Sequence, residues 1–158
     1  MKQCALKDFN TVYQFFTRKD ITGDITDDLA PDTFSMVKRM LSNDLVCMPS
    51  DGTLFVLSPV NSVVYTVHLN TTKPDKINLY LNTLEMARWV KNNTPIQRVV
   101  SYIPTISEAT LHYSRKIGMV EVGRVPEGFL KNGKLVDNII MSATVDKIIK
   151  ELSKWQQQ

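Results

Sequence analysis

The sequence predicts a mixed α/β (α+β) domain, in which helices cover both faces of a twisted mixed sheet. Two observations support this fold class. Runs of β-branched and aromatic residues recur between segments whose apolar residues are spaced three and four apart, as expected for strands and helices. In addition, helices connect some of the strands, and such crossovers require a parallel pair within a sheet otherwise built from hairpins. At 158 residues and 43% apolar composition, we expect one domain spanning residues 1–158.

The first 70 residues predict two helices and then a meander of strands. A first helix is expected over residues 5–20, with Leu6, Phe9 and Val12 on its apolar face. A second helix is expected after Pro31, which suits a first-turn position. The aspartates between them do not have the spacing of a calcium loop, so caps and turns explain them and no metal site is expected. Strands are expected over residues 44–50, 53–60 and 62–70.

A long amphipathic helix is expected to follow the third strand. The predicted apolar face comprises Ile77, Tyr80, Leu81, Leu84, Ala87 and Val90, and the predicted solvent face comprises Asn78, Asn82, Glu85 and Lys91. A strand is then expected over residues 96–104, and a short helix over 107–118 that ends at Gly118. The chain should close with a strand over 119–125, a loop, a hairpin turning at Asn132 and Gly133, and a terminal helix from Val145 to Trp155.

Charge and cysteine content restrict the class of protein. The two cysteines, Cys4 and Cys47, have no metal or redox spacing, which favours a reducing compartment. Asp8 interrupts any apolar core of a signal peptide, and no apolar run is long enough to span a bilayer, so we expect a soluble cytoplasmic protein. Residues 76–158 carry twelve basic against seven acidic side chains. This excess favours an anionic ligand, but no dense basic cluster with aromatics indicates nucleic acid.

Four segments carry a family resemblance: "VHLN", "LEMARWVKNNT", "RVVSYIP" and "SEATLHYSRKIGMVEVG". Together with the order of elements, they resemble the GNAT superfamily of acetyl-coenzyme A-dependent N-acetyltransferases, most closely the compact GNAT-like proteins of bacteriophages. The resemblance covers residues 60–142 well and the first 60 residues in element order only. It implies a central pair of parallel strands, residues 62–70 and 96–103, that splay apart to hold the cofactor.

The resemblance also implies where acetyl-coenzyme A would bind. Its pantetheine arm would pair with the backbone of Val67, His68 and Leu69, and Ser107 stands where the family often has an asparagine. The family usually binds the pyrophosphate with a glycine-rich turn, whereas this chain has "KPDKIN" there. Binding would therefore depend on Lys73, Lys76 and the helix-terminal amides of Ile77 and Asn78.

The candidate catalytic residues are His68, Tyr113 and Ser114. His68 is the first choice as the base that deprotonates an ammonium substrate, because its reference pKa is near 6.5. Glu121 and Asp137 come next, and Tyr102 is a candidate for orienting the substrate. The family often has a tyrosine acid four residues before the terminal glycine, where this chain has Ser114, while Tyr113 is turned by about 100° around the helix.

Two functions remain open from the sequence. The first is acetyl transfer from acetyl-coenzyme A to an unidentified amine. The second is a catalytically inactive phage structural or head-assembly protein that acts through protein partners and resides in the host cytoplasm or the virion. The acidic segment 20–32 and the terminal helix are the candidate contact surfaces for such partners.

Overall fold

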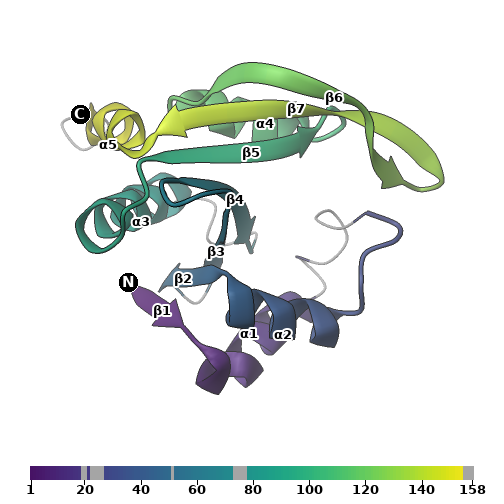
Figure 1. The fold of residues 1–158 in the computed structure, drawn as a ribbon, viewed down its shortest axis with the longest axis horizontal. Helices are drawn as coiled ribbons and strands as arrows, with labels where there is room; N and C mark the ends of the chain where they lie inside the picture. Colours follow the sequence, from purple (N-terminus) through teal and green to yellow (C-terminus); the bar gives the residue numbers. More distant parts are fainter. Residues whose placement is uncertain (19–20, 22–26, 51, 73–77, 155–158) are drawn as a thin grey trace.

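A computed structural model of the chain describes residues 1–18, 21, 27–50, 52–72 and 78–154 (Figure 1). It has a seven-stranded sheet with helices on both faces, which confirms the mixed class. The elements are β1 (Lys2–Cys4), a 3₁₀ turn (Leu6–Asp8), α1 (Phe9–Phe16), α2 (Thr33–Asn43), β2 (Leu45–Ser50), β3 (Thr53–Pro59), β4 (Val64–Thr71), α3 (Leu79–Asn93), β5 (Arg98–Pro104), α4 (Glu108–Lys116), β6 (Val120–Lys131), β7 (Lys134–Thr144) and α5 (Val145–Ser153).

The strands lie in the order β1-β2-β3-β4-β5-β7-β6, and all neighbours are antiparallel except β4 and β5. This parallel pair is short, since its register runs only from Val64 opposite Arg98 to Thr66 opposite Val100. Both strands continue beyond that point, β4 to Thr71 and β5 to Pro104. The expected splayed pair of central strands is therefore confirmed.

Two hydrophobic cores lie on opposite faces of the sheet. One face is covered by α3, α4 and α5, and its core includes Phe55, Leu84 and Met141. The other is covered by α1 and α2, and its core includes Val12, Val37 and Val56. Successive residues of β3 alternate between the two cores, as side chains of a strand must. This alternation assigns a face to each residue of β4, which pairs with β3 along its length.

The strands β6 and β7 extend beyond β5 as a long bent arm (Figure 1). The loop expected after Val125 is instead a break in register between Val125 and Phe129, within one continuous strand. Pro126, Glu127 and Gly128 resemble a loop in sequence, but Glu127 takes a positive φ of 51° and the arm accommodates the extra residues as a bulge. The expected turn at Asn132 and Gly133 is confirmed, with φ of 52° and 70°.

Two other expectations need correction. The first helix ends at Phe16 rather than near residue 20, and a short strand precedes it that three residues of sequence could not indicate. On α3, Asn82 is buried instead of facing water, while Leu81 is 53% exposed. Asn82 is buried because its amide donates hydrogen bonds to Ser50 and Thr53 at the β2–β3 connection, at 3.2 and 3.0 Å. Ile77 and Trp155 lie outside the described residues.

Candidate active site

The site begins at the gap where β4 and β5 separate. Just beyond the last paired residues, the Ser101 hydroxyl on β5 donates a 3.1 Å hydrogen bond to the Val67 carbonyl on β4. The backbone groups of Val67 therefore face the gap. Because alternate residues of a strand direct their backbone groups to the same edge, those of Leu69 also face it, whereas those of His68 face β3. Leu69 can thus offer backbone hydrogen bonds to a ligand in the gap, whereas the Val67 carbonyl already accepts the Ser101 hydroxyl.

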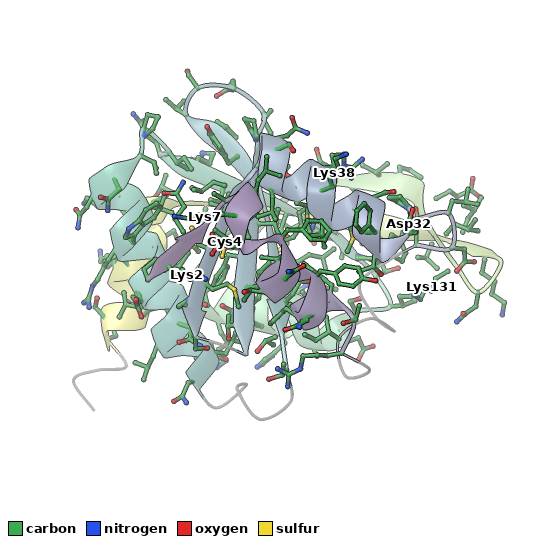
Figure 2. All side chains as sticks on the ribbon, turned by 90° about the horizontal axis from the view of Figure 1, so that it is seen from below. Lys2, Cys4, Lys7, Asp32, Lys38 and Lys131 are labelled. Atoms are coloured by element: carbon green, nitrogen blue, oxygen red, sulfur yellow. The ribbon has the colours of Figure 1, made fainter. Side chains whose placement is uncertain are left out.

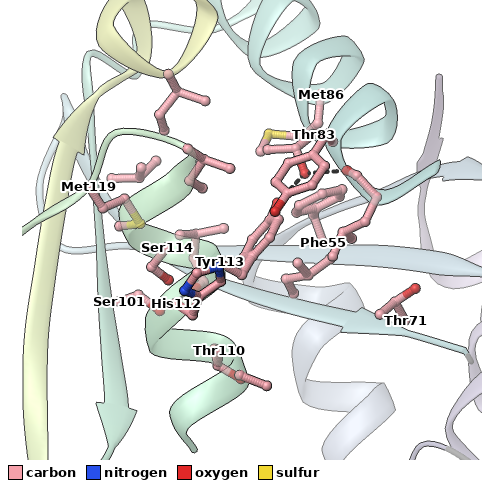
Figure 3. A pocket seen from close by; sticks show the side chains of 18 residues that line it. Phe55, Thr71, Thr83, Met86, Ser101, Thr110, His112, Tyr113, Ser114 and Met119 are labelled. Carbon is pink, nitrogen blue, oxygen red and sulfur yellow. Dashed lines mark hydrogen bonds between the residues drawn. The ribbon is translucent and has the colours of Figure 1, made fainter. Parts of the chain in front are cut away.

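A cavity of about 410 Å³ opens from this gap toward α3 and α4 (Figure 3). Most of its lining is apolar, and a few hydroxyl groups stand among the apolar side chains. Such a lining suits a long ligand that is largely uncharged along its length. The residues contributed by strands are Phe55, Val67, Leu69, Thr71, Val99 and Ser101, and those contributed by helices include Leu79, Tyr80, Thr83, Met86, Ala109, Tyr113 and Ser114.

Tyr113 crosses the cavity from α4 to α3 (Figure 3). Its hydroxyl forms a short hydrogen bond with the Thr83 hydroxyl, and its ring stacks on Tyr80 with centroids 5.5 Å apart. The single Thr83 proton goes to the Leu79 carbonyl at 2.8 Å, so Tyr113 is the donor to Thr83. Burial raises the pKa of Tyr113. The proton of Tyr113 is thus held by a protein partner.

The other two candidates on this helix differ in position. Ser114 is buried, with 4% of its surface exposed, and lines the cavity. Ser107 occupies the N-cap position of α4, but its side chain forms no capping hydrogen bond and it does not line the cavity. His112, on the same helix, is exposed and also reaches the cavity.

His68 lies on the opposite face of the sheet from the cavity. It pairs with Val56, which belongs to the core under α1 and α2, whereas its neighbours Val67 and Leu69 line the cavity. It is the first residue on that face beyond the paired part of β4 and β5, and its side chain keeps contact with solvent. Desolvation by the surrounding protein lowers the pKa of His68, and the carboxylate of Asp44 raises it by less.

The gap therefore has a histidine on one face and an apolar cavity on the other. Tyr102 of β5 alternates with the cavity-lining Ser101, so it lies on the His68 face, and 45% of its surface is exposed. Glu121 is exposed on the edge strand β6. The Asp137 carboxylate accepts hydrogen bonds from the Glu127 amide at 3.0 Å and from Arg124 at 3.5 Å, which fixes it in the bulge of the arm.

Most of the expected phosphate-binding turn lies outside the described residues. Lys73, Lys76 and Ile77 lie outside the described residues, and Asn78 is the N-cap residue of α3, without a capping hydrogen bond from its side chain. Sequence reasoning missed Ser101, Thr83 and Tyr80. The only signal for Ser101 was a hydroxyl residue between Val99 and Ile103 on the inward face of a strand, and nothing in the sequence linked Thr83 to Tyr113.

By sequence alone, the chain matches no known family model and no curated protein. Solved structures, in contrast, match over nearly its whole length. A GNAT-family acetyltransferase from Streptococcus pneumoniae is 16% identical with a TM-score of 0.67, covering 90% of this chain and 96% of its own. A spermidine N-acetyltransferase mutant from Vibrio cholerae is 9% identical with a TM-score of 0.71, covering 94% of each chain.

The chain has the GNAT fold. A third solved structure, an N-acetyltransferase from Staphylococcus aureus, is similar at 11% identity and a TM-score of 0.66, over 92% of this chain and 96% of its own. The resemblance noted in the sequence is therefore confirmed for the fold. Within the described part of this GNAT-fold chain, no helix is both long and apolar enough to span a membrane.

Proposed function

We propose that the chain binds acetyl-coenzyme A in the cavity and transfers its acetyl group to a primary amine. The observation that supports this most is the position of the cavity, which opens from the gap between β4 and β5. The backbone groups of Leu69 border the gap beyond the end of the ladder, and apolar side chains line the space behind it. This combination fits a pantetheine arm, which is uncharged along its length and carries amide groups. The acetyltransferases that share the fold support the same assignment.

Acetyl-coenzyme A would supply an activated acyl group with a thiolate as leaving group. His68 would act from the other face of the sheet by accepting a proton from the acceptor's ammonium group, which leaves the free amine to attack the thioester carbonyl. Its lowered pKa suits this role, since a base must be unprotonated at neutral pH. Tyr102, on the same face, would contact the acceptor. The gap brings the acceptor side and the cavity side together.

Tyr113 is poorly placed as an acid, because its proton is already donated to Thr83. Ser114, which lines the cavity one residue further along α4, is the alternative donor to the leaving thiolate, and solvent is the other source. We assign Tyr113 and Thr83 to bracing α4 against α3 across the cavity. For the phosphates, we propose Lys73, Lys76 and the amides of Ile77 and Asn78 at the start of α3, where a helix terminus favours an anion.

Calorimetric titration with coenzyme A and acetyl-coenzyme A at low salt tests this proposal. Ala109→Trp should abolish binding, because Ala109 lies exposed on α4 and lines the cavity. Glu108→Trp is the matched control, since the neighbouring residue is also exposed but does not line the cavity. Absence of binding to the folded, monodisperse wild-type protein would overturn the proposal, as would equal binding by both variants.

A second candidate is a protein that has kept this fold without the chemistry and binds other proteins, as in a phage head-assembly role. Two observations favour it. The proton of Tyr113 is already donated to Thr83, and the turn before α3 has no glycine for binding a pyrophosphate. A failure of coenzyme A to bind would make this the first choice.

A further inference from the structure

We propose that the acceptor is a small free amine, and that contacts between the segment before α2 and the tip of the β6–β7 arm exclude lysine side chains and N-termini of folded proteins. The inference rests on the proposed acetyl transfer and names its acceptor class. The segment of residues 27–30, together with residues 130–133 of the arm, is called the strap below.

Three hydrogen bonds form the strap. The Asp28 carboxylate accepts from the backbone amides of Gly133 at 2.7 Å and Asn132 at 3.0 Å, and the Asp28 amide donates to the Leu130 carbonyl at 3.0 Å. A turn closed by Ala30 and Asp27 shapes the segment, and Asp27 also accepts from the Leu29 amide at 2.8 Å. Hydrogen bonds to an ionised carboxylate are stronger than neutral ones, so this contact between segments over 100 residues apart is specific.

The strap lies at one end of the face from which an acceptor would approach. A ligand in the cavity occupies the α3–α4 side of the gap, so the amine has to enter from the His68 side. On that side α1 and α2 cover the β1–β3 end of the sheet, while the arm belongs to the opposite end, with β4 and β5 between them. Figure 2 shows Asp32, at the start of α2, and Lys131, in the arm, at the same end of the molecule.

The strap therefore connects the segment before α2 with the β6–β7 arm, the two elements that border the path of the acceptor. If α2 and the arm were not connected, an extended peptide could lie between them. The hydrogen bonds of the strap close that path at this end. A short amine has no chain on either side of its reacting nitrogen and needs no passage under the strap. The strap carries the carboxylates of Asp28 and Asp27 beside the cation of Lys131, and the carboxylate of Asp44 lies near His68, so acidic groups outnumber basic ones among these four and favour a cationic acceptor.

The first test compares acceptors. Wild-type protein with acetyl-coenzyme A is assayed with short diaminoalkanes and phenylethylamine, and with a lysine-containing heptapeptide and a folded protein bearing exposed lysines. We expect kcat/KM for the free amines to exceed that for the peptide by about 100-fold. Asp28→Ala should raise the peptide value by about tenfold. Asp28→Asn, which keeps the shape of the side chain, should give a smaller increase.

The second test needs no turnover. Hydrogen exchange at the amides of Asn132 and Gly133 should be slow in the wild type and about tenfold faster in Asp28→Ala. Calorimetry with coenzyme A present should show the free amine binding to wild type, and the heptapeptide binding only to Asp28→Ala. Asp146→Ala is the matched control, because Asp146 is an exposed carboxylate on α5 whose ion pair with Lys91 lies away from the strap. It should change neither exchange nor acceptor preference.

Each outcome has a distinct meaning. Peptide and amine used equally well by the wild type would overturn the acceptor assignment while leaving acetyl transfer intact. Unchanged exchange in Asp28→Ala would show that the strap does not hold the arm, and would also overturn it. If coenzyme A does not bind at all, the proposed function itself fails. Should Asp28→Ala not fold, the same comparisons made with Asp28→Asn decide the question.

Discussion

The Ser101 hydroxyl donates a hydrogen bond to the Val67 carbonyl at the point where β5 and β4 part. The backbone ladder between these strands ends one residue earlier, at Thr66 opposite Val100. A side chain thus replaces the next backbone contact and still leaves the strands free to diverge. This bond marks the beginning of the gap from which the cavity opens.

Replacing Ser101 by alanine should destabilise the protein modestly. The variant loses one partly buried hydrogen bond, which contributes about 1 kcal/mol to the free energy of unfolding. Urea denaturation measures the change. Ser42→Ala is the control, since the Ser42 hydroxyl donates to the Lys38 carbonyl on the exposed surface of α2. A loss no larger than that of the control would show that the bond across the gap contributes nothing.

If the chain transfers acetyl groups, His68→Ala should slow turnover far more than Tyr113→Phe. A positioned base contributes at least about 100-fold, so His68→Ala should lower kcat by that order. Tyr113→Phe should change it by less than about threefold, because the tyrosine proton is committed to Thr83. The release of coenzyme A measures both rates. Equal losses would contradict both assignments.

His68 should make stability depend on pH. In the folded protein its pKa is lowered, so the unfolded chain binds a proton more readily near the ordinary value of about 6.5. Its contribution is therefore fully present above that pH and is lost as pH falls below it toward the folded pKa. Urea denaturation at pH 8, 6.5 and 5.5 should show a smaller loss in His68→Gln than in wild type. An identical loss in both, with His112→Gln as control, would contradict the shift.

Binding of coenzyme A should depend strongly on salt. In the proposed site Lys73 and Lys76 would act as charges, which salt screens within about 8 Å at physiological ionic strength, whereas a glycine-rich turn would act through backbone fit. Lys73→Gln with Lys76→Gln should abolish binding. Coenzyme A without its ribose phosphate should lose less affinity than Lys76→Gln, because the pyrophosphate is expected nearest the helix end. Calorimetry at several salt concentrations checks this, and salt-independent binding would contradict it.

The sequence predicted the order of the main elements well because burial imposes a period on each of them. The strands β3, β4 and β5 and the helices α3 and α4 all carry such patterns. The periodic pattern placed Asn82 of α3 on the solvent face, which is wrong. Only the folded chain reveals that Ser50 and Thr53 lie close enough to accept its hydrogen bonds. The pattern failed again at the bulge of β6, where Gly128 and Glu127 have the composition of a loop.

The site was less accessible to sequence reasoning for the same reason. The gap followed from the crossover helix, and His68 could be placed on its strand. The face that His68 occupies depends on the register with β3, and the commitment of the Tyr113 proton depends on Thr83, which is 30 residues away. Contacts between distant segments leave no local pattern. Asp28 is the clearest case, because an aspartate in a turn does not indicate which hairpin it will bind.

The ladder between β4 and β5 is short, so the sheet has two halves. One half consists of β1, β2, β3 and β4, and the other of β5, β7 and β6. Within the described residues, the backbone ladder joins them at three residue pairs, and the Ser101–Val67 hydrogen bond adds a fourth contact. The core under α3, α4 and α5, the Lys91–Asp146 ion pair and the strap connect them elsewhere. A ligand seated in the gap would take the place of the missing ladder and act as a wedge bonded to both halves. Ligand binding would then add bonds between the two half-sheets, so that amides in β4 and β5 gain protection from exchange together.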